Sequence, residues 1–132
     1  MKTLLKGGTV VSGSGIRLLD ILIEGETIAQ VGENLEIAGA EILDVSDKLL
    51  FPGFIDAHTH FDLHVAGTVT ADDFESGTRA SLRGGTTTII DYATQYKGET
   101  LEEGLKNWVA KAERKANCDY GFHMSISEWT PD

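Results

Sequence analysis

The sequence predicts an α/β protein in which an all-β segment precedes strands that alternate with helices. Three observations predict it. Within residues 1–50, short apolar runs are separated by glycine-containing turns, which is typical of short strands. This pattern ends at Pro52 and Gly53. From residue 54 to residue 126, three apolar or β-branched runs alternate with two amphipathic stretches, as in parallel strands joined by helical crossovers.

The first 50 residues are expected to form a small sheet of hairpins. The predicted strands are residues 9–11, 18–23, 27–31 and 41–45. Gly25 lies in the strongest hairpin signal, because glycine supplies the backbone freedom that a tight reversal needs. A sheet of this size has one apolar face to cover, so it needs a partner surface.

The second segment is expected to contain three strands. Residues 54–60 predict a short buried strand, followed by a loop from residue 61 to about residue 70. Residues 86–92 are β-branched and apolar and predict a second buried strand, and residues 120–126 alternate as a third. Three strands cannot close a barrel, which takes eight, so the pattern fits the opening of a barrel or of a doubly wound sheet.

Two helices are expected between these strands. The first runs from about Asp72 to Gly84, where glycine suits a C-terminal cap. The second begins at Thr100, which forms a capping box with Glu103. Its apolar residues recur at helical spacing and are expected to pack in the core: Leu101, Leu105, Trp108, Val109 and Ala112.

Composition limits the range of functions. The 132 residues include 21 acidic and 11 basic side chains, and the net charge of -10 disfavours nucleic acid or an anionic membrane as a partner. The single cysteine excludes an internal disulfide and fits a reducing compartment. Because no apolar run is long enough for a signal peptide or a membrane span, the expected location is the cytoplasm.

His58 and His60 are the candidate metal ligands. Side chains alternate between the faces of an extended strand, so these two point to one side, with backbones about 6.6 Å apart, while Thr59 points to the other. Neutral imidazole is a good ligand for zinc and similar ions, although two histidines can also form a hydrogen-bonded pair. Their place at the carboxyl end of a strand favours metal, because catalytic groups of α/β barrels lie there.

Three other polar residues admit both a functional and a structural interpretation. Asp56 and Asp62 share parity with the histidines and could orient an imidazole, but aspartates at strand ends also cap backbone N–H groups. His123 could be a further ligand, but a polar residue in mid-strand is more often satisfied by its neighbours.

Acidic residues gather at the start of the first predicted helix, at Asp72, Asp73 and Glu75. A second carboxylate site is conceivable there, but acidic residues in a first helical turn mostly complement the helix dipole. Cys118 lies between a predicted helix and a predicted strand, away from the histidines. It is therefore expected to be a structural thiol and not a nucleophile.

Four stretches carry a family resemblance. They are residues 52–60 (Pro-Gly-Phe-Ile-Asp-Ala-His-Thr-His), 67–78 (Gly-Thr-Val-Thr-Ala-Asp-Asp-Phe-Glu-Ser-Gly-Thr), 84–91 (Gly-Gly-Thr-Thr-Thr-Ile-Ile-Asp) and 119–124 (Asp-Tyr-Gly-Phe-His-Met). Together they resemble the N-terminal part of the dihydropyrimidinases and D-hydantoinases, which are cyclic amidohydrolases of the amidohydrolase superfamily. The first stretch marks the superfamily, and the second is typical of the hydantoinase group.

The resemblance implies a β-sandwich segment over residues 1–50 and, over residues 51–132, the first strands and helices of a (β/α)8 TIM-type barrel that is incomplete in this chain. It implies two divalent metal ions, usually zinc, with His58 and His60 as the first two ligands. The bridging lysine, two later histidines and the aspartate that moves protons have no counterpart here, so no catalytic residue is assigned. Leu63 and Val65 match positions that line the substrate pocket.

The implied activity is hydrolysis of the ring amide of dihydropyrimidines or hydantoins to N-carbamoyl amino acids. The expected partners are a small cyclic amide and further copies of the complete enzyme in a homo-tetramer. This chain alone is expected to be inactive. The alternatives are a non-catalytic fragment or a scaffold like the dihydropyrimidinase-related proteins, and dihydroorotase and allantoinase share the superfamily pattern.

His64 and Ala66 depart from the family pattern, which often has proline and glycine there. This departure bears on substrate preference, and His64 is expected to be an exposed loop residue.

Overall fold

The computed structural model describes residues 1–129 and divides into two compact units, Met1–Pro52 and Gly53–Asp132. The last three residues of the expected second segment lie outside the described residues. Both units contain β-sheet, and the helices of the described chain lie in the second, so the protein has a mixed α/β fold. No helix within residues 1–129 is long and apolar enough to cross a membrane.

The first unit is a five-stranded sheet. Its strands are β1 (Lys2–Ser12), β2 (Gly15–Glu24), β3 (Thr27–Gly32), β4 (Glu41–Asp44) and β5 (Leu49–Leu50). The order is β3-β2-β1-β4, and β5 also pairs with β1. The first three strands are hairpin-connected, whereas β4 and β5 run parallel to β1. The expectation of hairpins alone is therefore wrong, because the chain after β3 crosses to the other edge of β1.

Strand β1 runs through Gly7 and Gly8, although the predicted strand covers residues 9–11 only. Its register with β2 shifts between Leu5 and Gly8, and Gly7 has a φ of +80°. The glycine pair thus forms an irregularity within one long strand.

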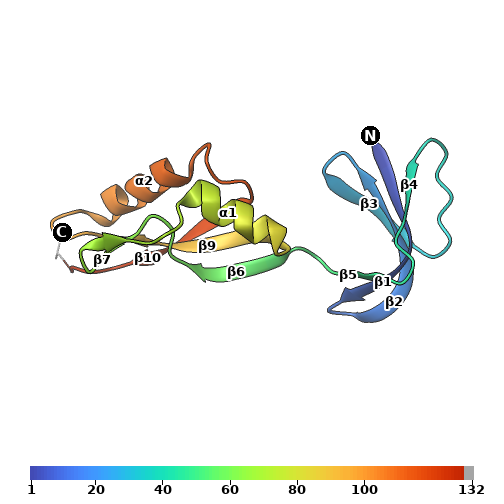
Figure 1. The fold of residues 1–132 in the computed structure, drawn as a ribbon, viewed down its shortest axis with the longest axis horizontal. Coiled ribbons are helices and arrows are strands. Elements are labelled where there is room, and N and C mark those ends of the chain that lie inside the picture. Colours follow the sequence, from blue (N-terminus) through green and yellow to red (C-terminus); the bar gives the residue numbers. More distant parts are fainter. Residues whose placement is uncertain (130–132) are drawn as a thin grey trace. The chain divides into compact units, whose positions relative to one another are not determined.

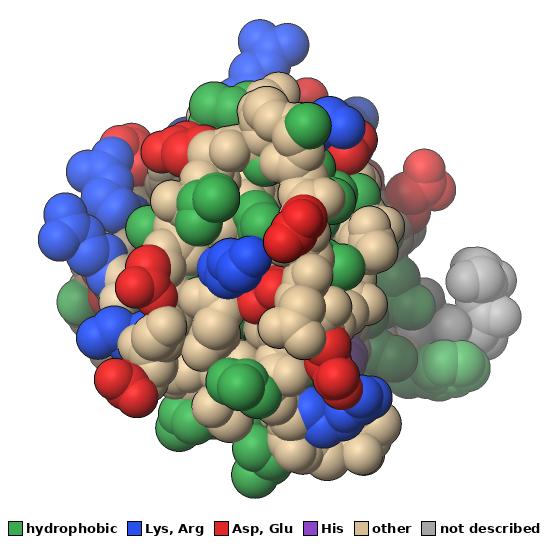
Figure 2. Space-filling model, turned by 90° about the vertical axis from the view of Figure 1, so that its right-hand side faces the viewer, with side chains coloured by type: hydrophobic (Ala, Val, Ile, Leu, Met, Phe, Trp, Pro, Cys, Tyr) green, Lys and Arg blue, Asp and Glu red, His purple; other side chains and the backbone are tan. Residues whose placement is uncertain are grey.

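The first unit leaves much apolar surface exposed. Leu4 and Leu22 are buried. A larger number of apolar residues are exposed, and they include Ile16, Leu18, Ile28, Val31, Ile42, Leu43 and Leu49. Figure 2 shows apolar side chains scattered among charged ones on the face that it presents. The unit buries a small core of its own, as expected for a sheet that needs a partner surface.

The second unit is a parallel sheet with helices on one face (Figure 1). Its elements are β6 (Phe54–Thr59), β7 (His64–Val65), β8 (Thr68–Val69), α1 (Phe74–Arg83), β9 (Thr86–Thr94), α2 (Leu101–Ala112) and β10 (Asp119–Ser125). The main sheet has the order β10-β9-β6, and both pairings are parallel. Its core consists of Phe74, Ile89, Ala93, Trp108 and Ala112.

The helix termini lie where the sequence predicts them. Thr100 caps α2, and its hydroxyl accepts the Glu103 N–H while the Glu103 carboxylate accepts the Thr100 N–H, so the predicted capping box is confirmed. Asp73 caps α1 and accepts the Ser76 N–H at 2.8 Å. Gly84 follows the last residue of α1 as its C-cap.

Burial in this unit differs from expectation in two places. The predicted buried strand β6 is mostly exposed, with Phe54 at 53% and Ile55 at 66%, and within it Thr59 alone is buried. Strand β6 is an edge of the described sheet, so it has a neighbour on one side only. The predicted stripe of α2 is likewise half covered, since Leu101, Leu105 and Val109 are exposed and Trp108 and Ala112 are buried.

Candidate functional site

The histidine pair lies at the carboxyl end of β6. Strand alternation places His58 and His60 on the face opposite to buried Thr59, as the sequence predicts. Their Nε2 atoms are 3.1 Å apart, and their rings meet edge to face with centroids 5.0 Å apart. Both residues are exposed. The two imidazoles therefore converge on one accessible point.

This geometry fits one divalent ion. Zinc binds histidine nitrogen at about 2.0–2.1 Å in a tetrahedral arrangement, which puts two ligand nitrogens about 3.3 Å apart. The observed 3.1 Å between His58 and His60 is close to that separation. The same distance allows a hydrogen bond between the rings, so an ion would replace the shared proton. Within residues 1–129, no group of three or more histidine, cysteine or acidic side chains is arranged to hold a metal.

Tyr92 lies between this pair and His123. Strand β9 is central, and its Tyr92 ring contacts His58 and His60 with centroids 4.5 and 5.2 Å apart. On the other side His123 of β10 is in register with Tyr92, with ring centroids 5.0 Å apart. The predicted further ligand thus shares the open face of the sheet, but it packs on Tyr92.

A buried carboxylate lies on the opposite, helix-covered face of β9. Asp91 is 0% exposed. Its Oδ2 accepts the Thr59 hydroxyl at 2.8 Å and the Phe61 N–H at 2.9 Å, and its Oδ1 accepts the Trp108 indole N–H at 3.0 Å. Asp91 therefore joins the end of β6 to α2.

A lysine of α2 holds the residue that follows Phe61. Lys111 Nζ donates to the Asp62 carbonyl at 2.6 Å and lies 3.8 Å from the Asp62 carboxylate. The same Nζ lies 4.0 Å from the centre of the Trp108 ring, in a cation–π contact. Asp62 has a φ of 49°, so this contact stabilises a left-handed turn after β6.

The two aspartates considered as orienting groups bond elsewhere. Asp56 Oδ1 accepts the backbone N–H of His58 at 3.2 Å, so it caps backbone, which was the structural interpretation. Asp62 faces Lys111.

The predicted substrate-binding residues lie in and beside a hairpin. Residues 61–70, expected to be a loop, contain the antiparallel pair β7 and β8. Leu63 is partly buried and packs against the core, whereas Val65 is exposed in β7. His64 is exposed in the same strand, and Ala66 lies in the turn with a φ of 51°.

The acidic residues at α1 have structural partners. Ser76 donates its N–H to Asp73, which lowers the pKa of that carboxyl, and its hydroxyl donates to Asp72 at 2.9 Å. Glu75 forms an ion pair with Arg79 at 2.6 Å. Burial and the neighbouring Asp119 raise the pKa of the Cys118 thiol, which favours its unreactive form.

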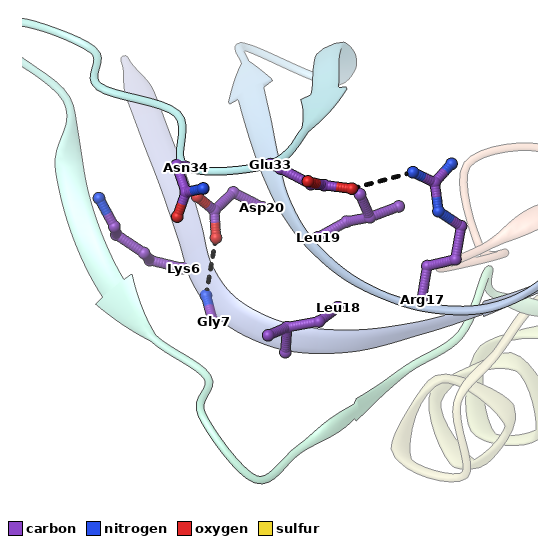
Figure 3. Close-up of a pocket in the computed structure, with 8 residues that line it drawn as sticks. All are labelled: Lys6, Gly7, Arg17, Leu18, Leu19, Asp20, Glu33 and Asn34. Carbon is purple, nitrogen blue, oxygen red and sulfur yellow. Dashed lines mark hydrogen bonds and ion pairs between the residues drawn. The ribbon is translucent and has the colours of Figure 1, made fainter.

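The first unit contains a hollow of about 420 Å³ (Figure 3). Its polar groups bond with one another: Asp20 accepts the Gly7 N–H at 2.8 Å, and Arg17 pairs with Glu33 at 3.1 Å. None of the predicted site residues lines it. We therefore assign no function to this hollow.

Asp91 and Tyr92 are the residues that the sequence reasoning missed. An aspartate inside an otherwise apolar strand is a usable signal, because a buried charge needs bonded partners. Tyr92 follows from strand alternation once β9 is known to lie beside β6.

Comparison with known proteins identifies the family of the chain. Residues 49–128 match the profile of the amidohydrolase family. The D-hydantoinase of Geobacillus stearothermophilus is 51% identical over 132 residues, which are all of this chain and 28% of that protein. The dihydropyrimidinase of Dictyostelium discoideum is 44% identical over 128 residues, which are 96% of this chain and 25% of that protein.

Solved structures show the same likeness. A crystal structure of D-hydantoinase superposes with a TM-score of 0.92 at 49% identity, over 99% of this chain and 28% of that one. The dihydropyrimidinase from Brevibacillus agri NCHU1002 gives 0.94 at 43% identity, again over 99% and 28%. The chain thus spans 25–28% of the length of these relatives. With the family profile matched across the histidine strand and both helices, the chain belongs to the amidohydrolase family.

Proposed function

We propose that this chain supplies part of the metal centre of a cyclic amidohydrolase that opens the ring amide of hydantoins or dihydropyrimidines. The observation that supports this proposal is the convergence of His58 Nε2 and His60 Nε2, 3.1 Å apart, at the end of a parallel strand. The likeness to D-hydantoinase over the whole chain supports the substrate class. The products would be N-carbamoyl amino acids.

The residues of this chain would bind and orient. His58 and His60 would hold a divalent ion, and Tyr92 would support both rings from the side of β9. In such enzymes, divalent ions polarise the amide carbonyl and lower the pKa of a bound water molecule. We propose zinc, because the imidazole spacing suits one tetrahedral zinc ion. We propose two ions in the complete site, as the family resemblance implies. Leu63 and Val65 are proposed to face the ring substituent of the substrate.

The order and direction of the strands support a larger fold. Strands β6, β9 and β10 are parallel and successive, with helices between them, which supports their being the first three strands of a (β/α)8 barrel. We propose that residues 1–50 contribute to a β-sandwich, and that the complete protein is a cytoplasmic homo-tetramer. Since catalytic zinc sites take three protein ligands, two histidines alone are expected to give an inactive chain.

A chimera tests this function. Residues 1–132 would replace the matching 132-residue stretch of the D-hydantoinase of Geobacillus stearothermophilus, to which they are 51% identical. We expect the chimera to hydrolyse hydantoin and dihydrouracil. His58→Ala and His60→Ala should each lower kcat/KM by more than about a hundredfold, because changes around metal ligands alone cost that much. Glu26→Ala, at an exposed position of the first unit, should leave kcat/KM within about twofold.

A chimera that folds and binds zinc but hydrolyses neither ring would contradict the proposal. That result would favour the non-catalytic alternative. Hydrolysis that survives His58→Ala unchanged would contradict the role of the pair.

A further inference from the structure

The backbone that carries His60 is not held by regular strand pairing. The register between β6 and β9 shifts between Asp56 and Thr59, and β6 ends at Thr59. His58 lies within this irregularity, and His60 lies beyond the strand. Another interaction must therefore fix residues 60 and 61, because two imidazoles keep a common focus only if their backbones stay in place.

Asp91 supplies that interaction. Its carboxylate accepts from the side chain of Thr59 and from the backbone of Phe61, the two residues on either side of His60. Its other oxygen accepts from Trp108 of α2, which is 0% exposed. A carboxylate buried in this way is tolerated only when its oxygens are bonded, so all three donors are held firmly.

We propose that Asp91 is a positioning residue for the histidine pair. From the helix-covered face of the sheet it fixes residues 59–61 against β9 and α2, so that the imidazoles on the other face stay focused on one ion. The part of this inference that concerns metal binding rests on the proposed function. The part that concerns the relative position of the two rings does not.

The chain offers matched controls for a purely structural effect. Asp20 is also a buried carboxylate, 5% exposed, and accepts the backbone N–H groups of Gly7 and Leu35, but it lies in the first unit. Thr78 is a buried threonine like Thr59, and its hydroxyl bonds to the Phe74 carbonyl and the Asn117 N–H. Asp20→Asn and Thr78→Val therefore remove comparable bonds whose partners do not belong to residues 58–61.

The experiment compares Asp91→Asn, Thr59→Val and Trp108→Phe with these two controls in the 132-residue chain. One readout is the nuclear Overhauser effect between the imidazole protons of His58 and His60. The other is the affinity for Zn²⁺, measured by calorimetry. Urea unfolding of each variant reports its stability, so variants of equal stability can be compared.

We expect Asp91→Asn to weaken the nuclear Overhauser effect between the two rings and to lower Zn²⁺ affinity about tenfold. Losses of this size are usual when a group that orients a metal ligand is removed. Thr59→Val should act in the same direction. The two controls should keep the inter-ring effect and stay within about twofold in affinity, even where they lose as much stability.

The proposal is overturned if Asp91→Asn and Thr59→Val keep the wild-type ring contact and affinity. Should Asp91→Asn fail to fold, Thr59→Val and Trp108→Phe decide in the same way. If wild-type protein binds no Zn²⁺ but the ring contact is lost only in the three variants, the positioning role stands and the proposed metal function fails.

Discussion

Gly77 of α1 lies so close to the ring of Phe61 that a Cβ at position 77 would overlap the ring carbons. Phe61 follows His60 in the chain, and its N–H donates to Asp91. Helix α1 thus packs against the end of β6 through a contact that only glycine permits.

Gly77→Ala should therefore destabilise the protein. Alanine gains about 1 kcal/mol over glycine in a helix interior, but overpacking costs about 1–3 kcal/mol, so we expect a net loss of about 1 kcal/mol. Urea unfolding measures it. Gly121→Ala is the control, because a Cβ there meets no atom within 4 Å. A rise in stability for Gly77→Ala would contradict this expectation, because it would show that the Phe61 ring can move aside at little cost.

The hairpin of β7 and β8 turns at Ala66 and Gly67, which have φ values of 51° and 78°. Alanine in the left-handed region is strained by about 1–2 kcal/mol. Glycine avoids this strain, but it loses about 0.5–1 kcal/mol more chain entropy on folding than alanine does. Ala66→Gly should thus raise the free energy of unfolding by about 0.5 kcal/mol. Gly67→Ala should lower it. Equal or lower stability for Ala66→Gly in urea would refute the expected strain.

The two helix caps predict an acid-sensitive contribution to stability. The Ser76 N–H lowers the pKa of Asp73, and the Thr100 N–H lowers the pKa of Glu103. A carboxyl whose folded pKa is depressed stabilises the fold above its unfolded pKa, about 4, and this stabilisation is lost as pH falls through the folded value.

The stability of the parent should accordingly fall between about pH 5 and pH 3 more steeply than that of the Asp73→Asn, Glu103→Gln double variant. Urea midpoints across this range measure the difference. Identical slopes for the two proteins would mean that the pKa values of these two carboxyls do not differ between the folded and unfolded states.

Features set by neighbours in the sequence could be predicted. Thr100 and Glu103 are three residues apart, so their capping box is visible in the sequence, and the common direction of His58 and His60 follows from strand alternation alone. The bonds of Asp91 could not be predicted, since its partners lie 17, 30 and 32 residues away.

Other features escaped prediction for different reasons. Ala66 is not a residue typical of a positive φ, so the hairpin was expected to be a loop. Parallel pairing of β4 with β1 depends on where the chain crosses after β3, which no short pattern encodes. The exposure of Ile55 reflects the edge position of β6 and not its apolar composition.

Zinc K-edge X-ray absorption on the zinc-loaded chain tests the histidine pair most directly. We expect imidazole nitrogens at about 2.0–2.1 Å from zinc, with two of them lost in the His58→Ala, His60→Ala double variant. The His64→Ala, His123→Ala double variant should keep the parent spectrum. An unchanged zinc environment after loss of His58 and His60 would contradict their assignment as metal ligands.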